Sequence, residues 1–196
     1  MKKIFIIFTL VWLGLISNAF SADFDKGWDA YEAGDYTTAL KEWRPLAEQG
    51  FASAQYNMGQ MYRLGHGVSQ DDTEAVKWWH LAAKQGDSDA QFNLGDSYEN
   101  GDGVIQDNSK AVKWFRLAAE QGHVEAQTNL GLMYALGNGV IEDIVLAHMW
   151  SNIAASQGNE HAKKNKDILV KKMSDEEIIE AQRLARQCVK NNYKGC

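Results

Sequence analysis

The chain has 196 residues, 45% of them hydrophobic, and its 20 basic and 26 acidic side chains give a net charge of −6. This length suffices for one ordinary domain with a hydrophobic core. A chain of this charge repels nucleic acid and anionic lipid, so neither is an expected partner.

The first residues, MKKIFIIFTLVWLGLISNAFSA, have the three parts of a secretory signal peptide. Two lysines precede a short apolar run from Ile4 to Ile16, and small residues allow cleavage after Ala19 or Ser21. The run is shorter than the about 20 residues that a transmembrane helix needs, and an uncleaved anchor is the alternative. We expect residues 1–21 to be removed and the protein to be periplasmic or secreted, without integral membrane association. Loss of two lysines and no acid takes the net charge from −6 to −8.

From residue 39 the chain repeats with a period of 36 residues, the pattern of a repeat protein. Three copies without insertion or deletion start at Ala39, Ala75 and Ala111, and a fourth copy, which starts at Ala147, degrades. Each copy has the periodicity of two amphipathic helices separated by glycines. One repeat cannot bury its apolar face alone, so neighbouring repeats must stack. The sequence therefore predicts an all-α protein, a right-handed α/α solenoid of helix-turn-helix units over residues 39–172.

Within each copy, apolar spacing and glycines mark where the helices should begin and end. In the second copy the pattern predicts helices over residues 73–85 and 88–98, with Asp72 or Thr73 as the N-cap of the first. A glycine recurs inside the second of these helices, although it costs about 1 kcal/mol relative to alanine there. Its recurrence predicts a close helix crossing, with the recurring alanines as the opposing surface. The glycines are Gly59, Gly95 and Gly131, and the alanines are Ala47, Ala83 and Ala119.

The two ends of the repeat array have predicted caps of their own. Residues 22–38 are expected to form a first capping helix and its turn, and residues 173–196 a C-terminal capping helix with a disulfide tail. Ser174, with a glutamate three residues later, has the spacing of a capping box at the start of that last helix. Cys188 and Cys196 are the only cysteines, and in an oxidising compartment they are expected to form a disulfide, with two free thiols as the alternative.

The loop YENGDGVIQDNSK, residues 98–110, is rich in oxygen ligands and at first resembles half of a calcium site. An EF-hand loop with its glycine at Gly103 would need an acid at Tyr98 and a glutamate at Ser109. In the other two copies the acids of this loop vary, whereas the glycines and a following valine persist. Glycine tolerates positive φ and so ends helices; the loops are predicted helix stops, and no metal or cofactor is expected. The recurring glycines are Gly65 and Gly67, Gly101 and Gly103, and Gly137 and Gly139.

Four short motifs recur, namely LAAxQG, AQxNLG, MY and GxGV, as in the stretches Leu117–Gly122, Ala126–Gly131, Met133–Tyr134 and Gly137–Val140. Through them the chain resembles the Sel-one-like repeat family, relatives of the tetratricopeptide repeat, from residue 39 to about residue 164. Just before, WDAYEAGDYTTAL resembles the first helix and turn of a tetratricopeptide unit. The resemblance implies a solenoid in which the first helix of each pair lines a concave groove that holds extended peptides.

No arrangement typical of catalysis is found in the sequence. The histidines are far apart and form no zinc-binding spacing, and no serine lies in a GxSxG context. Among the tryptophans, Trp43 and Trp79 are expected in the core, whereas the indoles recurring one position earlier are expected to keep an exposed edge. These are Trp78, Trp114 and Trp150.

A mid-helix asparagine recurs in every full copy, although asparagine is an indifferent helix former. One interpretation is structural, with each amide bonding the backbone of a neighbouring repeat. The other is functional, because residues spaced four, three and four apart on a helix line one face. The candidate ligand-binding residues on this face are Asn57, Gln60, Asp89, Asn93, Asp96, Glu125 and Asn129.

These observations favour an exported, non-enzymatic scaffold, expected to be a monomer, that binds a protein or peptide in its groove. The acids on the candidate face favour a basic or amide-rich partner. The alternative is a hydrolase acting on cell-wall or β-lactam-like substrates. It is implied only by the resemblance, because certain cysteine-rich relatives have been associated with penicillin binding or hydrolysis.

Overall fold

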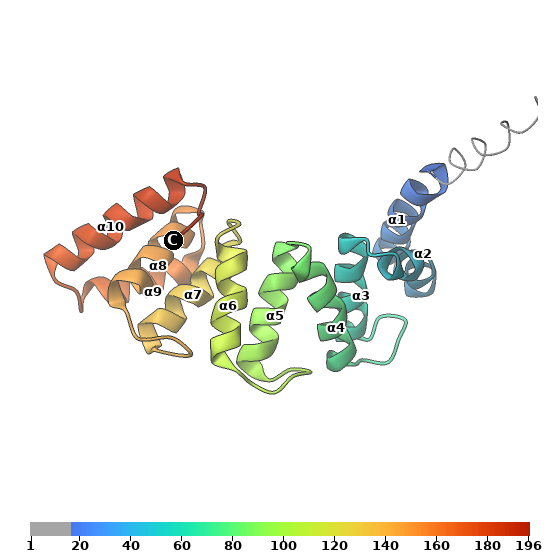
Figure 1. Cartoon of the computed structure of the whole chain (residues 1–196), viewed down its shortest axis with the longest axis horizontal. Helices are drawn as coiled ribbons and strands as arrows, with labels where there is room; N and C mark the ends of the chain where they lie inside the picture. Colours follow the sequence, from blue (N-terminus) through green and yellow to red (C-terminus); the bar gives the residue numbers. More distant parts are fainter. Residues whose placement is uncertain (1–16) are drawn as a thin grey trace, which may run out of the picture.

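A computed structural model describes the backbone of residues 17–196 and the side chains of residues 24–196, so the predicted signal peptide lies almost wholly outside the described residues. Figure 1 shows the helices following one another along a shallow arc, with α1 and α10 at its two ends. The described part holds ten helices and no strand, which confirms the predicted all-α solenoid. In chain order the helices are α1 (Ser17–Glu32), α2 (Tyr36–Glu48), α3 (Ala52–Leu64), α4 (Asp72–Lys84), α5 (Ser88–Asn100), α6 (Asn108–Ala119), α7 (Val124–Leu136), α8 (Ile144–Ser156), α9 (Glu160–Val170) and α10 (Asp175–Lys190).

The helices form two layers that alternate along the chain. Each helix from α1 to α8 packs against the next, and α10 folds back onto α8. In addition α5 contacts α7, and α7 contacts α9. This extra contact places α5, α7 and α9 side by side. Together with α3, which has the same position in its repeat, we call them the inner layer. The outer layer consists of α2, α4, α6 and α8.

An aspartate begins each helix of the outer layer. The Asp71 carboxylate accepts a hydrogen bond from the Glu74 backbone N–H at 3.0 Å, so the predicted cap at Asp72 or Thr73 is wrong by one residue or two. The reason is that Asp72 already has helical backbone, whereas the N-cap must be extended so that its side chain can turn back to the first free N–H groups. Its equivalents Asp35, Asp107 and Asp143 cap α2, α6 and α8 in the same way.

The two loop glycines of each copy have different tasks. Gly101 is the left-handed C-cap of α5, with φ of 82°, which confirms the predicted helix stop. Gly103, with φ of 71°, lies against the start of α4, where a Cβ would stand 2.3 Å from the Asp72 carbonyl oxygen. The second glycine therefore lets each loop rest on the preceding outer helix. The other copies repeat the left-handed pair, and Gly139 repeats the close approach to backbone, at Asn108.

The glycines inside the inner helices mark close crossings, as predicted, but the opposing surface differs from the prediction. A Cβ on Gly95 would lie 2.5 Å from the Phe115 ring, and one on Gly59 would lie 2.3 Å from the Trp79 indole nitrogen. Aromatic side chains of the next outer helix, and not the recurring alanines, thus press onto the first two glycines. At Gly131 the opposing group is smaller, the Ser151 hydroxyl at 3.0 Å.

The tryptophans divide in a way that spacing did not predict. Trp43 and Trp79 are buried in the core, as expected, whereas Trp78 and Trp114 are only partly buried. Trp150 shares their position in the repeat but is 0% exposed, so the expected exposed edge is wrong there. The physical reason is α10, which packs on α8 and covers the last outer helix.

Glutamines connect each repeat to the next through buried hydrogen bonds. In the middle of the array, Gln91 Nε2 donates to the Ala83 carbonyl at 3.1 Å, and Gln91 Oε1 accepts from Gln121 Nε2 at 2.8 Å. The same pair of bonds occurs at Gln55 with Ala47 and Gln85, and at Gln127 with Ala119 and Gln157. We call this series the glutamine ladder. It ties the inner helix of one repeat to the outer helices on both sides of it.

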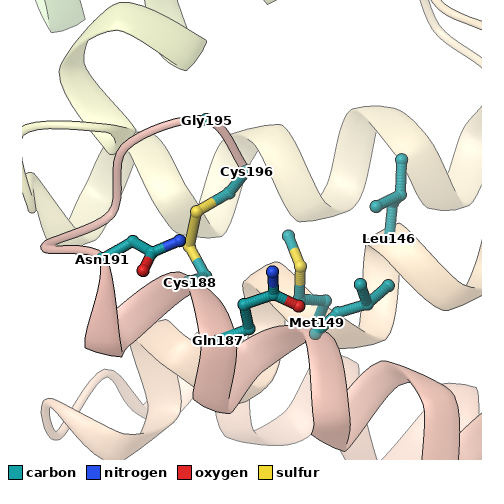
Figure 2. A pocket seen from close by; sticks show the side chains of 8 residues that line it. Leu146, Met149, Gln187, Cys188, Asn191, Gly195 and Cys196 are labelled. Atoms are coloured by element: carbon teal, nitrogen blue, oxygen red, sulfur yellow. A yellow bond between two sulfur atoms is a disulfide. The ribbon is translucent and has the colours of Figure 1, made fainter.

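The C-terminal end is closed by α10 and a short covalent loop. Ser174 and Glu177 form the predicted capping box, and Cys188 forms the predicted disulfide with Cys196, with 5.5 Å between the two Cα atoms. Figure 2 shows how the tail after α10 turns back so that Cys196 meets Cys188. Within this tail the Tyr193 ring lies against Gly122, in the turn between α6 and α7. The tail after α10 therefore contacts the array at an earlier repeat, in the turn between α6 and α7.

Candidate functional site

The seven residues predicted to bind a ligand all lie on the inner layer, but their exposure differs. Asp89 and Glu125 are exposed, and Gln60, Asn93, Asp96 and Asn129 are partly buried. Asn57 is only 8% exposed. The structure thus places a polar stripe along α3, α5 and α7, which we call the inner face, and its first asparagine lies at the bottom of a pocket rather than on an open surface.

The asparagines do not make the backbone bonds that a structural role would require. The Nδ2 atom of Asn57 is buried and has no hydrogen-bond partner among the described residues, and that of Asn93 is buried beside the Tyr56 hydroxyl. The bonds between repeats are made by the glutamine ladder instead. A buried N–H without a partner carries the full cost of its lost hydration, so such a group needs an explanation. Water or a ligand acceptor would satisfy such a donor.

Tyr56 links the stripe of α3 to that of α5. Its hydroxyl accepts a hydrogen bond from Gln60 Nε2 at 3.0 Å, and the Asn93 amide lies beside it. Burial raises the pKa of the Tyr56 phenol, and the nearby Asp89 carboxylate raises it further. The phenol therefore stays protonated and can donate its own hydrogen to an acceptor. Gln60, Asn93 and Asp89, three of the predicted residues, thus meet around one aromatic side chain that the sequence analysis did not single out.

A histidine joins the predicted acids of α5 and α7. His123 Nδ1 caps α7 by accepting from the Ala126 N–H at 3.2 Å, and Nε2 lies 3.3 Å from the Asp89 carboxylate. The ring also stacks on Phe92, with 4.6 Å between centroids, and Nδ1 lies 3.5 Å from the Glu125 carboxylate. A neutral imidazole that accepts at Nδ1 and donates at Nε2 satisfies the cap and the Asp89 contact together. His123 therefore positions Asp89 at the repeat boundary.

The electrostatic character of the inner face changes along the array. In its middle, burial raises the pKa of the Asp96 carboxyl, and the neighbouring Asp102 raises it further. Arg63, which lies 3.5 Å from Asp102, offsets part of this effect. Towards the C-terminus the equivalent position of α7 is Leu132, which is exposed and apolar. The face is thus aromatic and amide-rich at its start, acidic in its middle and apolar at its end.

A pocket of about 140 Å³ opens at the N-terminal start of the inner face. Its walls are built by α1, α2 and α3. Two predicted residues, Asn57 and Gln60, contribute to it, whereas Trp28 and Tyr31 of α1 were missed because they lie outside the 36-residue repeat. The lining residues are Trp28, Tyr31, Trp43, Tyr56, Asn57 and Gln60.

A second pocket, of about 100 Å³, lies between α8 and α10 beside the disulfide (Figure 2). Its walls include Leu146 and Met149 of α8 and Gln187 of α10. It contains no titratable side chain, and its place between a helix and the helix that covers it is that of a packing gap.

The described part of the chain shows neither a metal cluster nor a membrane-spanning helix. Over residues 24–196, no group of three or more His, Cys, Asp or Glu side chains is arranged to hold a metal ion. None of the helices described is both long and apolar enough to cross a membrane.

The fold and the inner face define an α-solenoid repeat protein of the kind that presents one continuous surface to a partner. The Sel1 repeat model matches residues 52–87, 88–123 and 124–159, and the chain belongs to the Sel1 repeat family. These units begin at the inner helices α3, α5 and α7, whereas the copies read from the sequence begin within the outer helices, with the same period. Sel1 repeats are generally non-catalytic scaffolds that mediate protein interactions.

Solved structures of related proteins have the same fold. The chain is similar to c5321, a protective antigen of uropathogenic Escherichia coli strains that displays an SLR fold, with 29% identity and a TM-score of 0.62. That match covers 89% of this chain but only 47% of the antigen, so this chain spans about half its length. A Sel1 repeat protein from Oxalobacter formigenes shares 40% identity, with a TM-score of 0.61, over 66% of this chain and 97% of that protein. Helicobacter pylori cysteine-rich protein B, at 20% identity, has a TM-score of 0.53 over 66% of this chain and 93% of that protein and shares the fold. No curated protein matches the chain significantly.

Proposed function

We propose that this protein is an exported, non-enzymatic scaffold that binds an extended segment of a partner protein along its inner face. The observation that carries the proposal is the contrast between two sets of amides in the same helices. The glutamines of the ladder are fully engaged with neighbouring repeats, whereas the buried Asn57 Nδ2 donor has no partner and the Asn93 amide meets only the Tyr56 phenol. A peptide backbone supplies carbonyl acceptors at regular intervals and suits a series of amide donors.

The charge of the inner face supports a basic partner. Asp89, Asp96 and Glu125 lie along it, and the chain as a whole is acidic. Complementary charge steers association and selects among partners more than it adds affinity. No observation favours the hydrolase alternative, so we do not propose it.

The test of this function replaces Asn57, Asn93 and Asn129 together by alanine. We expect the triple variant to lose capture of its partner from periplasmic extract in a crosslinking pulldown, because the donors to the ligand backbone are gone. We expect its helix content and melting temperature by circular dichroism to stay close to those of the wild type, because no described backbone group depends on the Asn57 or Asn93 Nδ2 atoms and alanine is the better helix former.

The matched control is Gln106→Ala, which removes an exposed amide outside the inner face and should leave capture unchanged. A triple variant that melts far below the wild type would show that the asparagines are scaffold. A stable triple variant that still captures the same partners would move the binding surface elsewhere.

Export is the second part of the proposal, and the first 21 residues motivate it. We expect the protein to be recovered from the periplasm or medium at a mass that lacks its first 19 to 21 residues. Intact-mass spectrometry of the purified protein measures this directly. Retention of Met1 in the exported fraction, or recovery only from the cytoplasm, would refute it.

A further inference from the structure

The N-terminal pocket has aromatic walls. Trp28 and Tyr31 of α1 lie nearly parallel, with 6.2 Å between ring centroids and 27° between planes. Trp43 of α2 approaches both, at 6.4 Å from Trp28 and 5.6 Å from Tyr31, and Tyr56 of α3 also lines the pocket. Trp28 is 45% exposed although it is large and apolar, whereas Trp43 is 1% exposed. The pocket is therefore an open aromatic box rather than a filled part of the core.

Polar groups of α3 give the box a donor and an acceptor. Asn57 lines it and has its buried Nδ2 donor without a partner. Gln60 donates through Nε2 to the Tyr56 hydroxyl, which leaves the Gln60 Oε1 atom as an acceptor. A ligand that fits must offer both a carbonyl oxygen and an N–H group within a few ångströms of each other, as a peptide residue with a nitrogen-bearing side chain does.

The charges around the box select the sign of that side chain. On α1, Asp25 and Glu32 are exposed and lie three residues before and four residues after Trp28, so they flank its indole on the helix surface. Across the box, Asp89 and Asp87 both act on the Tyr56 phenol. The one lysine of α1, Lys26, pairs with Glu42. Acids thus surround an aromatic box, an arrangement that attracts cations through ring faces and long-range charge.

We propose that this pocket anchors an arginine side chain of the extended basic segment that the inner face binds. A planar guanidinium stacks on indole and phenol rings and carries five N–H donors, one of which can reach Gln60 Oε1. The Asn57 amide then donates to the carbonyl of the arginine residue or of its neighbour. This inference rests on the proposed function and names its first anchoring site.

The box occurs once in the array. Gly27 lies against the Trp43 indole as Gly59 lies against the Trp79 indole, so α1 occupies the place of an inner helix. At the positions that correspond to Trp28 and Tyr31, the next inner helix carries Gln60 and Arg63. Later junctions therefore cannot form the box, and the pocket fixes where the segment's arginine lies.

The test uses three peptides as probes and the purified protein with its disulfide intact. The peptides are acetyl-Gly-Gly-X-Gly-Gly-amide with X as arginine, as citrulline, its neutral isostere, or as lysine. Binding is followed by NMR through the side-chain amide signals of Asn57 and Gln60 and the indole N–H signals of Trp28 and Trp43. We expect the arginine peptide to shift these signals, and the citrulline peptide to bind about tenfold more weakly because it lacks the charge. Equal binding of citrulline, or shifts confined to other residues, would overturn the proposal, and equal or tighter binding of lysine would overturn the assignment to arginine.

Variants separate the box from the rest of the inner face. Trp28→Ala removes a half-exposed ring and should weaken the arginine peptide by about tenfold, whereas Trp28→Phe should retain part of the binding. Trp114→Ala removes a partly buried indole far along the array and is the matched control, expected to leave the titration unchanged. Circular dichroism melts confirm that each variant is folded, and Gln60→Leu, which keeps the rings and removes the acceptor, provides a second lesion in the box.

Failure of this inference and failure of the proposed function give different results. If partner capture depends on Asn93 and Asn129 but not on Trp28, and the arginine peptide does not bind, the box is refuted and the scaffold function stands. If the peptide binds and Trp28 is required, but the asparagine triple variant captures partners normally, the box stands as a site and the function proposed for the inner face is refuted.

Discussion

Replacing Gly95 by leucine should lower the free energy of unfolding by more than about 3 kcal/mol and leave no folded protein at 37 °C, as measured by circular dichroism and denaturant titration. A Cβ at this position would stand 2.5 Å from the Phe115 ring, so even one carbon forces α5 and α6 apart. Overpacking a well-packed site typically costs about 1–3 kcal/mol, and leucine adds three further carbons. Because each repeat is stabilised by its neighbours, separating one pair also weakens the contact with the rest of the array.

The alanine variants of two equivalent glycines provide the control. A Cβ in Gly95→Ala meets an aromatic ring at 2.5 Å, whereas in Gly131→Ala it meets the Ser151 hydroxyl at 3.0 Å and backbone atoms of Ala147 and Ser151 at 3.2 and 3.3 Å, a milder crowding. In an unstrained helix, alanine would gain about 1 kcal/mol over glycine at both positions. We expect Gly95→Ala to be destabilising and Gly131→Ala to be close to neutral. Equal effects in the two variants would show that the close approach of the Phe115 ring is not the reason for glycine at position 95.

Replacing Gln127 by leucine should lower the free energy of unfolding by about 1–3 kcal/mol, because it removes two hydrogen bonds between repeats, each worth about 0.5–1.5 kcal/mol. Gln127 is 0% exposed, donates to the Ala119 carbonyl at 3.1 Å and accepts from Gln157 Nε2 at 2.7 Å. Leucine fills nearly the same volume and removes both bonds, so the loss reports the hydrogen bonds rather than a cavity. Urea titration followed by circular dichroism gives the value.

The control for the ladder is Gln106→Leu. Gln106 also donates to a backbone carbonyl, that of Glu99 at 2.7 Å, but it does so at an exposed site where water can replace it. We expect a change within about 0.5 kcal/mol there. If Gln127→Leu were neutral or stabilising, the glutamine ladder would contribute nothing net to the stacking of the repeats.

The helices and their stacking could be predicted because the repeat supplies the same information several times. Gly101 and its equivalents recur because the end of each inner helix needs a left-handed residue. The acids of the same loop vary between copies, and this difference showed that the loop is a helix stop and not a calcium site. The opposing surface of Gly95 could not be predicted in the same way. Which outer residue meets an inner glycine depends on how two helices cross, and spacing along one helix does not contain the crossing geometry.

The sequence indicated part of the candidate inner face, for identifiable physical reasons. The inner-face asparagines stood out because asparagine is unusual within helices, whereas Gln91 and its equivalents were passed over because glutamine is common on helix surfaces. A second glutamine, Gln85, Gln121 or Gln157, recurs at the end of each outer helix. The recurrence of both glutamines in every copy could have indicated a hydrogen bond between repeats. The aromatic box was missed because Trp28 and Tyr31 precede the repeat, and a single occurrence leaves no internal comparison.

The two ends of the array differ in how strongly they are held, and this difference should determine where local unfolding begins. At the C-terminus α10 packs on α8 and the disulfide holds the tail against the turn before α7. At the other end α1 packs chiefly on α2, and nothing covalent holds it. Local unfolding in a linear array starts where fewest neighbours are lost, so amide hydrogen exchange should be fastest in α1 and slow towards α8. An occupant of the box would bridge α1, α2 and α3, so partner binding would also close the end of the array that frays first.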